Sequence, residues 1–273
     1  MENFQLQLFF QIIGIGSASG LLYHNDLLYL ISDSSSFLYE YSINENELNK
    51  IALVENPEKN IPKKDKPDFE SITLDGNKLL IFGSGSTENR DSLKTYHFST
   101  KKIRAKDLSE LYNKIKSQFS IQNDELNIEG VFYLNKKFYL FQRGNGKNAS
   151  NGIFIVNKDK EIEIQFKKVE LPKINNIQSS FTDAILVDET IYFLASVEDT
   201  ISTYDDGEIL GTFLGKMKLA DFSIEETILI SDKNKFEGIT LYKKTENQLE
   251  FLLCEDNDTD VLESKIYKLT INK

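Results

Sequence analysis

A short phrase recurs five times along the chain, and each copy places an acidic or hydroxyl side chain at the same point. The copies lie roughly 50 to 60 residues apart, a spacing typical of β-propellers, in which each repeat forms one four-stranded blade. If five blades close into a ring, these side chains converge on one axis, where several carboxylates repel one another unless a cation lies among them. Oxygen ligands in a roomy ring suit calcium, with magnesium as the alternative. The expected metal ligands are Ser19, Glu70, Glu129, Asp183 and Glu237.

The same five positions also have a purely structural interpretation. The acids could accept hydrogen bonds from backbone amides where strands begin, and the small residue after each acid could serve close strand packing. We favour the cation, because several unpaired carboxylates near one axis are costly to bury without it.

Three residues outside the repeated phrase are candidates for catalysis. Arg143 opens a polar loop, and its guanidinium could clamp a phosphate or carboxylate above the ion or form an ordinary salt bridge. Asp33 and Glu255 are the candidate bases. Neither His24 nor His97 has an obvious nucleophile partner, and the chain lacks a nucleophile elbow and a phosphate-binding loop. A Ser-His-Asp hydrolase and a P-loop enzyme are therefore disfavoured.

The segments around each phrase must position these groups. Aromatic and β-branched runs alternate with breaks of Asn, Asp, Gly and Ser, which is typical of short strands and turns. We predict an all-β, five-bladed propeller that forms a single domain over residues 1–273. The last repeat lacks a fourth strand, and the N-terminal apolar run is expected to supply it and close the ring. The predicted blades cover 17–56, 68–105, 127–170, 181–231, and 235–273 together with 4–12.

One segment breaks the β pattern. Its apolar residues are spaced for one face of a helix, and Asp107 with Glu110 resembles a capping box. We predict a short helix near 107–119, inserted between the second and third blades.

The long polar loops are expected on the same face as the axial residues. In a blade the second strand returns to the rim where the first began, so the loops after it lie beside the axial phrase. Long loops on a rigid scaffold commonly carry function, and we expect a small-molecule or protein ligand there. These loops are 84–92, 143–151, 197–211 and 255–263.

The composition of the chain restricts the classes of partner that the protein is expected to bind. The chain has 32 basic and 43 acidic residues, for a net charge of −11, which disfavours nucleic acid and anionic membranes. No apolar stretch is long enough to span a bilayer, and the N-terminus reads as a strand rather than a signal peptide. The single cysteine, Cys254, excludes an internal disulfide. We expect a cytoplasmic monomer.

The repeated phrases carry two resemblances. As a set they look like an uncharacterised bacterial β-propeller family of unknown function. They also resemble the calcium-activated nucleotidases of the apyrase type, five-bladed propellers with an axial calcium surrounded by Ser and Glu residues. Asp183 stands where that family carries Ser, and the residues at matching places are Ser19, Glu70, Glu129 and Glu237.

The likeness to the nucleotidases is weaker in the loops. That family has an acid- and arginine-rich loop after its first B strand, where this chain has residues 32–36, rich in serine. A paired arginine of the third blade is reduced here to the single Arg143. The resemblance thus implies an axial calcium more strongly than nucleotide hydrolysis.

Two functions follow. The first is a metal-binding propeller whose axial cation is structural and whose long-loop face binds a ligand or partner. The alternative is a calcium-dependent hydrolase of a phosphate or ester, with Arg143 stabilising negative charge and Asp33 or Glu255 as base. The sequence leaves open whether the protein is an enzyme.

Overall fold

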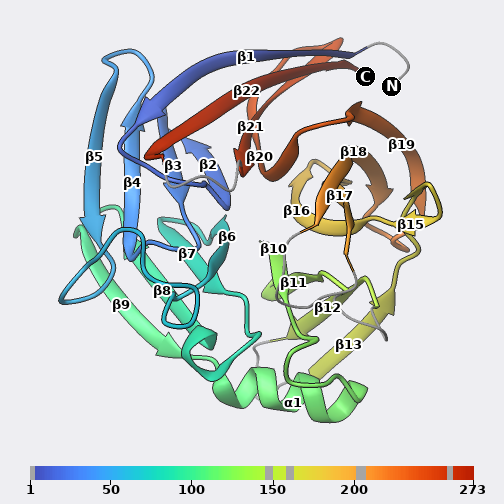
Figure 1. Ribbon diagram of the computed structural model, residues 1–273, viewed down its shortest axis with the longest axis horizontal. Helices are drawn as coiled ribbons and strands as arrows, with labels where there is room; N and C mark the ends of the chain where they lie inside the picture. The colour runs from blue at the N-terminus through green and yellow to red at the C-terminus, as the bar shows by residue number, and fades with distance from the viewer. Residues whose placement is uncertain (1–3, 145–149, 158–162, 201–206, 257–260) are drawn as a thin grey trace.

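The computed structural model describes residues 4–144, 150–157, 163–200, 207–256 and 261–273. Five four-stranded antiparallel sheets surround a central axis, which confirms the predicted five-bladed, all-β propeller (Figure 1). Within the described ranges, no helix has the length and apolarity needed to cross a bilayer.

Each of the first four blades is built from four consecutive strands, which follow one another from the axis outward. The first blade contains β2 (Gly20–His24), β3 (Leu27–Ile31), β4 (Phe37–Ser42) and β5 (Glu47–Ala52). The second contains β6 (Phe69–Leu74), β7 (Lys78–Gly83), β8 (Ser92–His97) and β9 (Lys102–Asp107), with the 3₁₀ turn η1 (Glu88–Arg90) between β7 and β8. The third contains β10 (Ile128–Leu134), β11 (Lys137–Gln142), β12 (Gly152–Asn157) and β13 (Glu163–Lys168). The fourth contains β16 (Ser180–Val187), β17 (Thr190–Asp199), β18 (Glu208–Lys218) and β19 (Ile224–Ser231). A small hairpin, β14 (Lys173–Ile174) and β15 (Ile177–Gln178), precedes this blade.

The fifth blade joins the two ends of the chain. Its inner strands are β20 (Lys235–Lys244), β21 (Gln248–Asp256) and β22 (Glu263–Asn272), and its outermost strand is β1 (Phe4–Ile13). β1 pairs antiparallel with β22, so that Phe4 lies opposite Ile271 and Ile13 opposite Glu263. The predicted closure by the N-terminal strand is confirmed, and it gives β22 the partner that it would otherwise lack.

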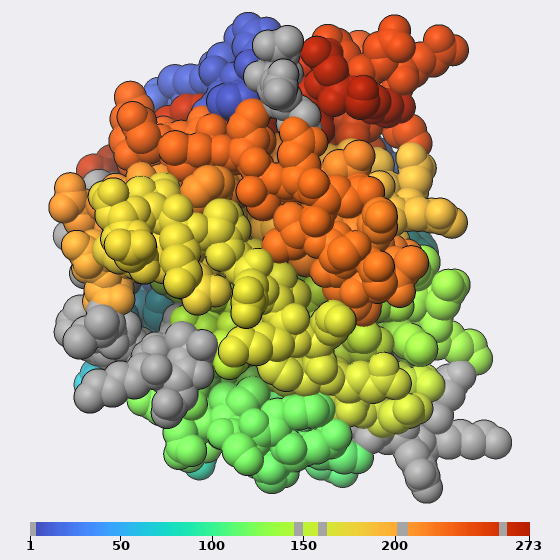
Figure 2. Space-filling model, turned by 90° about the vertical axis from the view of Figure 1, so that its right-hand side faces the viewer, coloured from blue at the N-terminus to red at the C-terminus, as the bar shows by residue number. Residues whose placement is uncertain are grey.

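The predicted helix is also present. α1 (Ser109–Phe119) follows β9 and lies at the periphery of the ring, next to the third blade (Figure 1). The Asp107 carboxylate accepts a hydrogen bond from the Ser109 amide at 2.7 Å, which satisfies one free donor of the first turn. At the other end, Gln118 donates to the Ile164 carbonyl of β13 at 3.1 Å. Figure 2 shows the outer side of the ring, where the segments of successive blades pack one after another from green to orange.

One predicted loop consists partly of strand. Residues 197–211 were expected to be a loop, but β17 continues to Asp199 and β18 begins at Glu208, with Glu198 opposite Ile209. The hairpin is longer than expected because β17 and β18 continue their backbone pairing past the apolar residues and into the polar segment. Residues 201–206 lie outside the described residues, as do 145–149 and 257–260 of two other predicted loops.

Candidate functional site

The axial side chains are aimed by β-bulges. In four of the innermost strands the pairing with the next strand skips one residue, and a bulge of this kind re-aims the side chain of the extra residue. In the first blade the equivalent residue directly precedes β2, and its amide donates to the Ile31 carbonyl at 3.1 Å. All five side chains at this position are buried. The five positions are Ser19, Glu70, Glu129, Thr182 and Glu237.

This register corrects the sequence alignment in the fourth blade. The extra residue there is Thr182, whereas Asp183 pairs with Leu194 and so occupies the place of the small residue in the other phrases. The two Asp183 oxygens accept backbone amides, from Ala184 at 2.7 Å and from Ile239 of the neighbouring blade at 2.8 Å. Asp183 was expected to be a metal ligand. In the structure it accepts hydrogen bonds from backbone amides, as the structural interpretation proposed for the acids.

The two hydroxyl residues at the axial position join neighbouring blades. Ser19 donates to the Phe69 carbonyl of β6, and Thr182 donates to the Phe236 carbonyl of β20 at 2.7 Å. Only the three glutamates, Glu70, Glu129 and Glu237, bring charge to the axial position.

The glycines that follow two of the axial glutamates lie close to the neighbouring inner strand, as the structural interpretation expects. A Cβ on Gly130 would lie 2.7 Å from the Ala184 amide nitrogen of the next blade, and a Cβ on Gly238 would lie 2.5 Å from Leu21 Cδ2. The neighbouring backbone thus requires a glycine at 130, whereas a side chain at 238 would first meet the side chains of Leu21 and Cys254.

Each glutamate is flanked by two further polar residues of its own blade. One stands two positions before the glutamate, and the other stands where the second strand leaves the rim. In the second and third blades a backbone hydrogen bond joins these two flanking residues. In the fifth blade they lie opposite each other in neighbouring strands. The flanking pairs are Asp68 with Ser84, Asn127 with Arg143, and Lys235 with Asp256.

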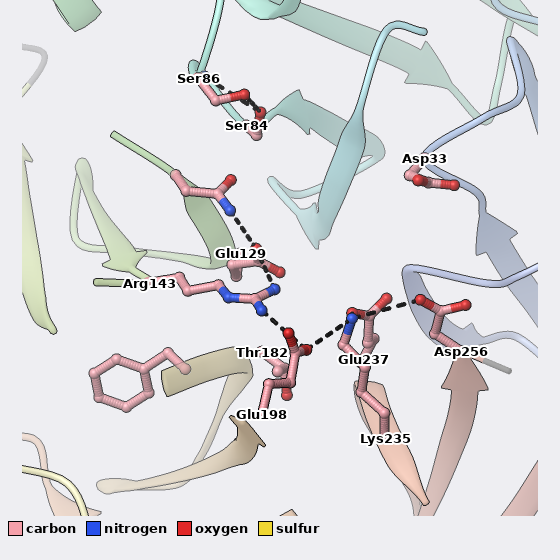
Figure 3. Close-up of polar contacts among 12 residues, drawn as sticks. Asp33, Ser84, Ser86, Glu129, Arg143, Thr182, Glu198, Lys235, Glu237 and Asp256 are labelled. Atoms are coloured by element: carbon pink, nitrogen blue, oxygen red, sulfur yellow. Dashed lines mark hydrogen bonds and ion pairs between the residues drawn. The ribbon is translucent and has the colours of Figure 1, made fainter. Parts of the chain in front are cut away.

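The third and fifth blades supply basic partners to their glutamates. Glu129 accepts a hydrogen bond from Asn127 Nδ2 at 2.7 Å and pairs with Arg143 Nη1 at 3.3 Å. Lys235 Nζ lies 2.9 Å from Glu237 and 3.6 Å from Asp256. Figure 3 shows these side chains directed toward one central region of the ring.

Glu198 of β17 links the two groups. Its carboxylate lies 2.9 Å from Arg143 Nη2 and 3.0 Å from Lys235 Nζ, so it connects the third, fourth and fifth blades (Figure 3). Burial alone would raise the pKa of Glu198, but Arg143 and Lys235 lower it to about 2. Glu198 is not among the residues predicted from the sequence, because it lies outside the repeated phrase.

The first and second blades form a separate ionic group. Lys66, in the connection before β6, pairs with Asp33 and lies 2.8 Å from Asp68 Oδ1. Asp68 also pairs with Arg90 Nη1 at 2.9 Å and accepts a hydrogen bond from Ser84. Asp68 and Lys66 are not among the site residues predicted from the sequence. Asp68 could have been found, because it lies two positions before an axial glutamate.

Glu70 differs from the other two axial glutamates. It is 8% exposed, and in the described part of the chain its carboxylate forms neither a hydrogen bond nor an ion pair. Oxygens of Glu70, Asp33 and Asp68 all lie within 4.8 Å of one another. Burial, reinforced by the charge of Asp68, holds the pKa of Glu70 well above its usual range. Three hard oxygen donors, one of them buried without a partner among the described residues, fit calcium or magnesium.

The three predicted catalytic residues lie in different surroundings. Asp33 joins Glu70, whereas Arg143 is held between Glu129 and Glu198. Glu255 accepts hydrogen bonds from Asn234 and from the Tyr267 hydroxyl, the latter at 3.0 Å. Side chains alternate along a strand, so Glu255 lies on the opposite face of β21 from Asp256, which pairs with Lys235.

Comparisons with known proteins identify a family and a fold. The model of a family described as "Family of unknown function (DUF6929)" matches residues 14–271. No curated protein matches the sequence. Among solved structures, glutaminyl cyclase of Myxococcus xanthus is similar with a TM-score of 0.55 and 10% identity, over 98% of this chain and 97% of the other. A luciferin-regenerating enzyme is similar with a TM-score of 0.53 and 10% identity, over 98% and 95% of the two chains. At this identity the likeness shows the fold alone, and the resemblance to the nucleotidases stays a prediction.

Proposed function

The chain belongs to the DUF6929 family of unknown function, and we propose that it is a cation-dependent binding propeller. A divalent cation, calcium or alternatively magnesium, would be held by Glu70 with Asp33 and Asp68. The cation would stabilise the ring, and the face that carries the loops would bind a ligand or partner.

The unpartnered carboxylate of Glu70 carries this proposal. Glu129 and Glu237 each have a basic partner within 3.3 Å, so the ring supplies its own counter-charges in those blades. Among the residues that the structure describes, Glu70 has no such partner, although Asp33 and Asp68 lie beside it. A carboxylate that is largely removed from water beside two other carboxylates is costly to keep charged, and a bound cation would remove that cost.

Lys66 sets a condition on this site. Its ammonium already lies against Asp33 and Asp68, so a divalent cation must either displace it or bind on the Glu70 side of it. When bound, the cation supplies a positive charge to which an oxygen-bearing ligand can coordinate. Glu70 and the two aspartates would hold the cation in place.

A calcium-dependent hydrolase is the second candidate, favoured by the position of Asp33 beside Glu70. Arg143 was expected to stabilise negative charge in this reaction, but its guanidinium is engaged by Glu129 and Glu198. The two similar structures are titled as enzymes, but a shared fold carries no activity to this chain. Binding is therefore the better-supported function.

Elemental analysis of the purified protein, paired with thermal melts, tests the proposal. We expect about one equivalent of calcium or magnesium, a lower Tm in EDTA, and recovery when the metal is returned. Absence of metal together with an unchanged Tm would refute the cation site. Metal-dependent turnover in a panel of phosphomonoesters, phosphoanhydrides and esters would favour the hydrolase instead.

A further inference from the structure

A pocket lies where helix α1 meets the second and third blades, away from the axial carboxylates. Its volume is about 140 Å³. The helix connects β9 to β10, a place that the four-stranded repeat could bridge with a loop, and its first turn forms one wall of the pocket. The apolar lining comes from Phe82, Leu93, Leu108, Leu111, Phe138 and Val156.

The lining fits one aromatic ring. Phe82 and Phe138 meet edge to face, with ring centroids 5.3 Å apart, and both are almost fully buried, so they form a rigid floor. Half-buried Leu111 offers the accessible apolar surface. An apolar cavity of about 150 Å³ lined by similar side chains stays dry and binds benzene. This pocket has a similar volume, but its lining also includes polar side chains, so it suits a ring that carries a polar head group.

The mouth of the pocket carries charge. Lys106, Asp107 and Glu110 line it, and all three are exposed. Asp107 accepts hydrogen bonds from the amide and hydroxyl of Ser109, so it is engaged in starting the helix. Glu110 is thus the carboxylate available to a ligand. Two carboxylates against one ammonium, on a chain of net charge −11, favour a cationic head group.

We propose that this pocket binds a small primary amine that carries a single aromatic ring. The ring packs against Leu111, above the buried side chains of Phe82 and Phe138, and the ammonium group lies at the mouth beside Glu110. The pocket is independent of the cation site, so either can fail without the other.

Titration calorimetry with phenethylamine tests the proposal, with 3-phenylpropanoate as the acidic counterpart of the same ring. We expect saturable 1:1 binding of the amine with a roughly millimolar Kd. At low salt the amine should bind at least about threefold more tightly than the acid, and the difference should shrink in 1 M salt. No saturable binding of the amine, or equal binding of the acid at low salt, would overturn the proposal.

Variants locate the ligand. Leu111→Phe and Val156→Phe each fill the pocket and should abolish binding; Leu111 is only half-buried, so its variant is the one expected to fold without difficulty. Glu110→Gln should remove the preference for the amine but leave the ring bound. Leu229→Phe, at an exposed position of β19, is the matched control and should bind normally. Undiminished binding in Leu111→Phe, with a melt that shows the variant folded, would place the ligand elsewhere and refute the assignment.

Discussion

Glu70 is the residue at which the charge balance of the ring is incomplete. Its carboxylate is buried beside Asp33 and Asp68, and its pKa is raised by burial and by the charge of Asp68. The folded protein therefore keeps a proton on Glu70 at pH values where the unfolded chain has lost it. The unfolded state then binds fewer protons, and stability must fall as the pH rises above the ordinary glutamate pKa of about 4.3.

The fall in stability with rising pH can be measured. In EDTA the Tm should fall from pH 5 to pH 8, and added calcium should restore more stability at pH 8, where the cation replaces the proton. Glu70→Gln cannot ionise and should flatten the decline, although raised pKa values of Glu129 and Glu237 leave part of it. Glu246→Gln, an exposed change, should keep the full slope. A slope in Glu70→Gln equal to that of the wild type would show that Glu70 does not titrate as described.

Lys66 gives a second prediction at this scale. Its ammonium pairs with Asp33 and Asp68, so Lys66→Met should leave Asp33 without this partner and Asp68 with Arg90, which makes an external cation more favourable there. The metal-free variant should be less stable, by roughly 3–5 kcal/mol for a broken buried ion pair. The calcium-induced rise in Tm should be larger than in the wild type, as measured by melts in EDTA and in calcium. Lys66→Arg keeps the charge and serves as the control; a smaller calcium response in Lys66→Met would contradict the competition between Lys66 and the cation.

At the scale of elements, β17 joins three blades through one side chain. Glu198 lies between Arg143 and Lys235, which come from the third and fifth blades. Its lowered pKa means that these pairs stabilise the fold above the unfolded pKa and lose their effect as the pH falls toward 2. The inner strands thus depend on ionic contacts as well as on apolar packing.

Glu198→Gln tests this link. The change leaves two buried cations without their shared anion, and we expect a loss of about 3–5 kcal/mol in the free energy of unfolding by urea denaturation. The matched control is Glu225→Gln in the same blade, because Glu225 also pairs with two lysines, at 3.6 and 3.8 Å, but at the surface. That change should cost less than about 1 kcal/mol. Equal losses in the two variants would mean that the Glu198 bridge adds nothing beyond a surface pair.

At the scale of the whole molecule, the ring depends on its N-terminal strand. Removal of residues 1–13 deletes β1 and leaves the edge of β22 unpaired. We expect the Tm to fall by on the order of 10 °C and the protein to associate with rising concentration, as measured by melts and size-exclusion chromatography. Removal of residues 1–3 alone is the control. A monomeric truncated protein with the wild-type Tm would show that β1 is dispensable for closure.

The sequence predicted the ring but only part of the site. The period of the repeated phrase, the missing strand of the last blade and the helical spacing near α1 were sufficient for the fold, because each depends on the order and spacing of residue types along the chain. The axial place of Asp183 was wrong by one residue, since the position of a bulge is fixed by pairing with β17 and not by the phrase itself. Lys66 and Glu198 come from a connection and a strand end that only the closed ring brings to the axis.

A calorimetric titration of calcium into EDTA-stripped protein at pH 7.5, with the wild type and Glu70→Gln side by side, tests whether the axial carboxylates bind a cation. We predict one saturable site in the wild type and at least a tenfold weaker one in the variant, with wild-type binding retained in Glu246→Gln. Absence of binding to the wild type, with magnesium as well as calcium, would contradict a cation site at the axis. Undiminished binding to Glu70→Gln would contradict its assignment to Glu70.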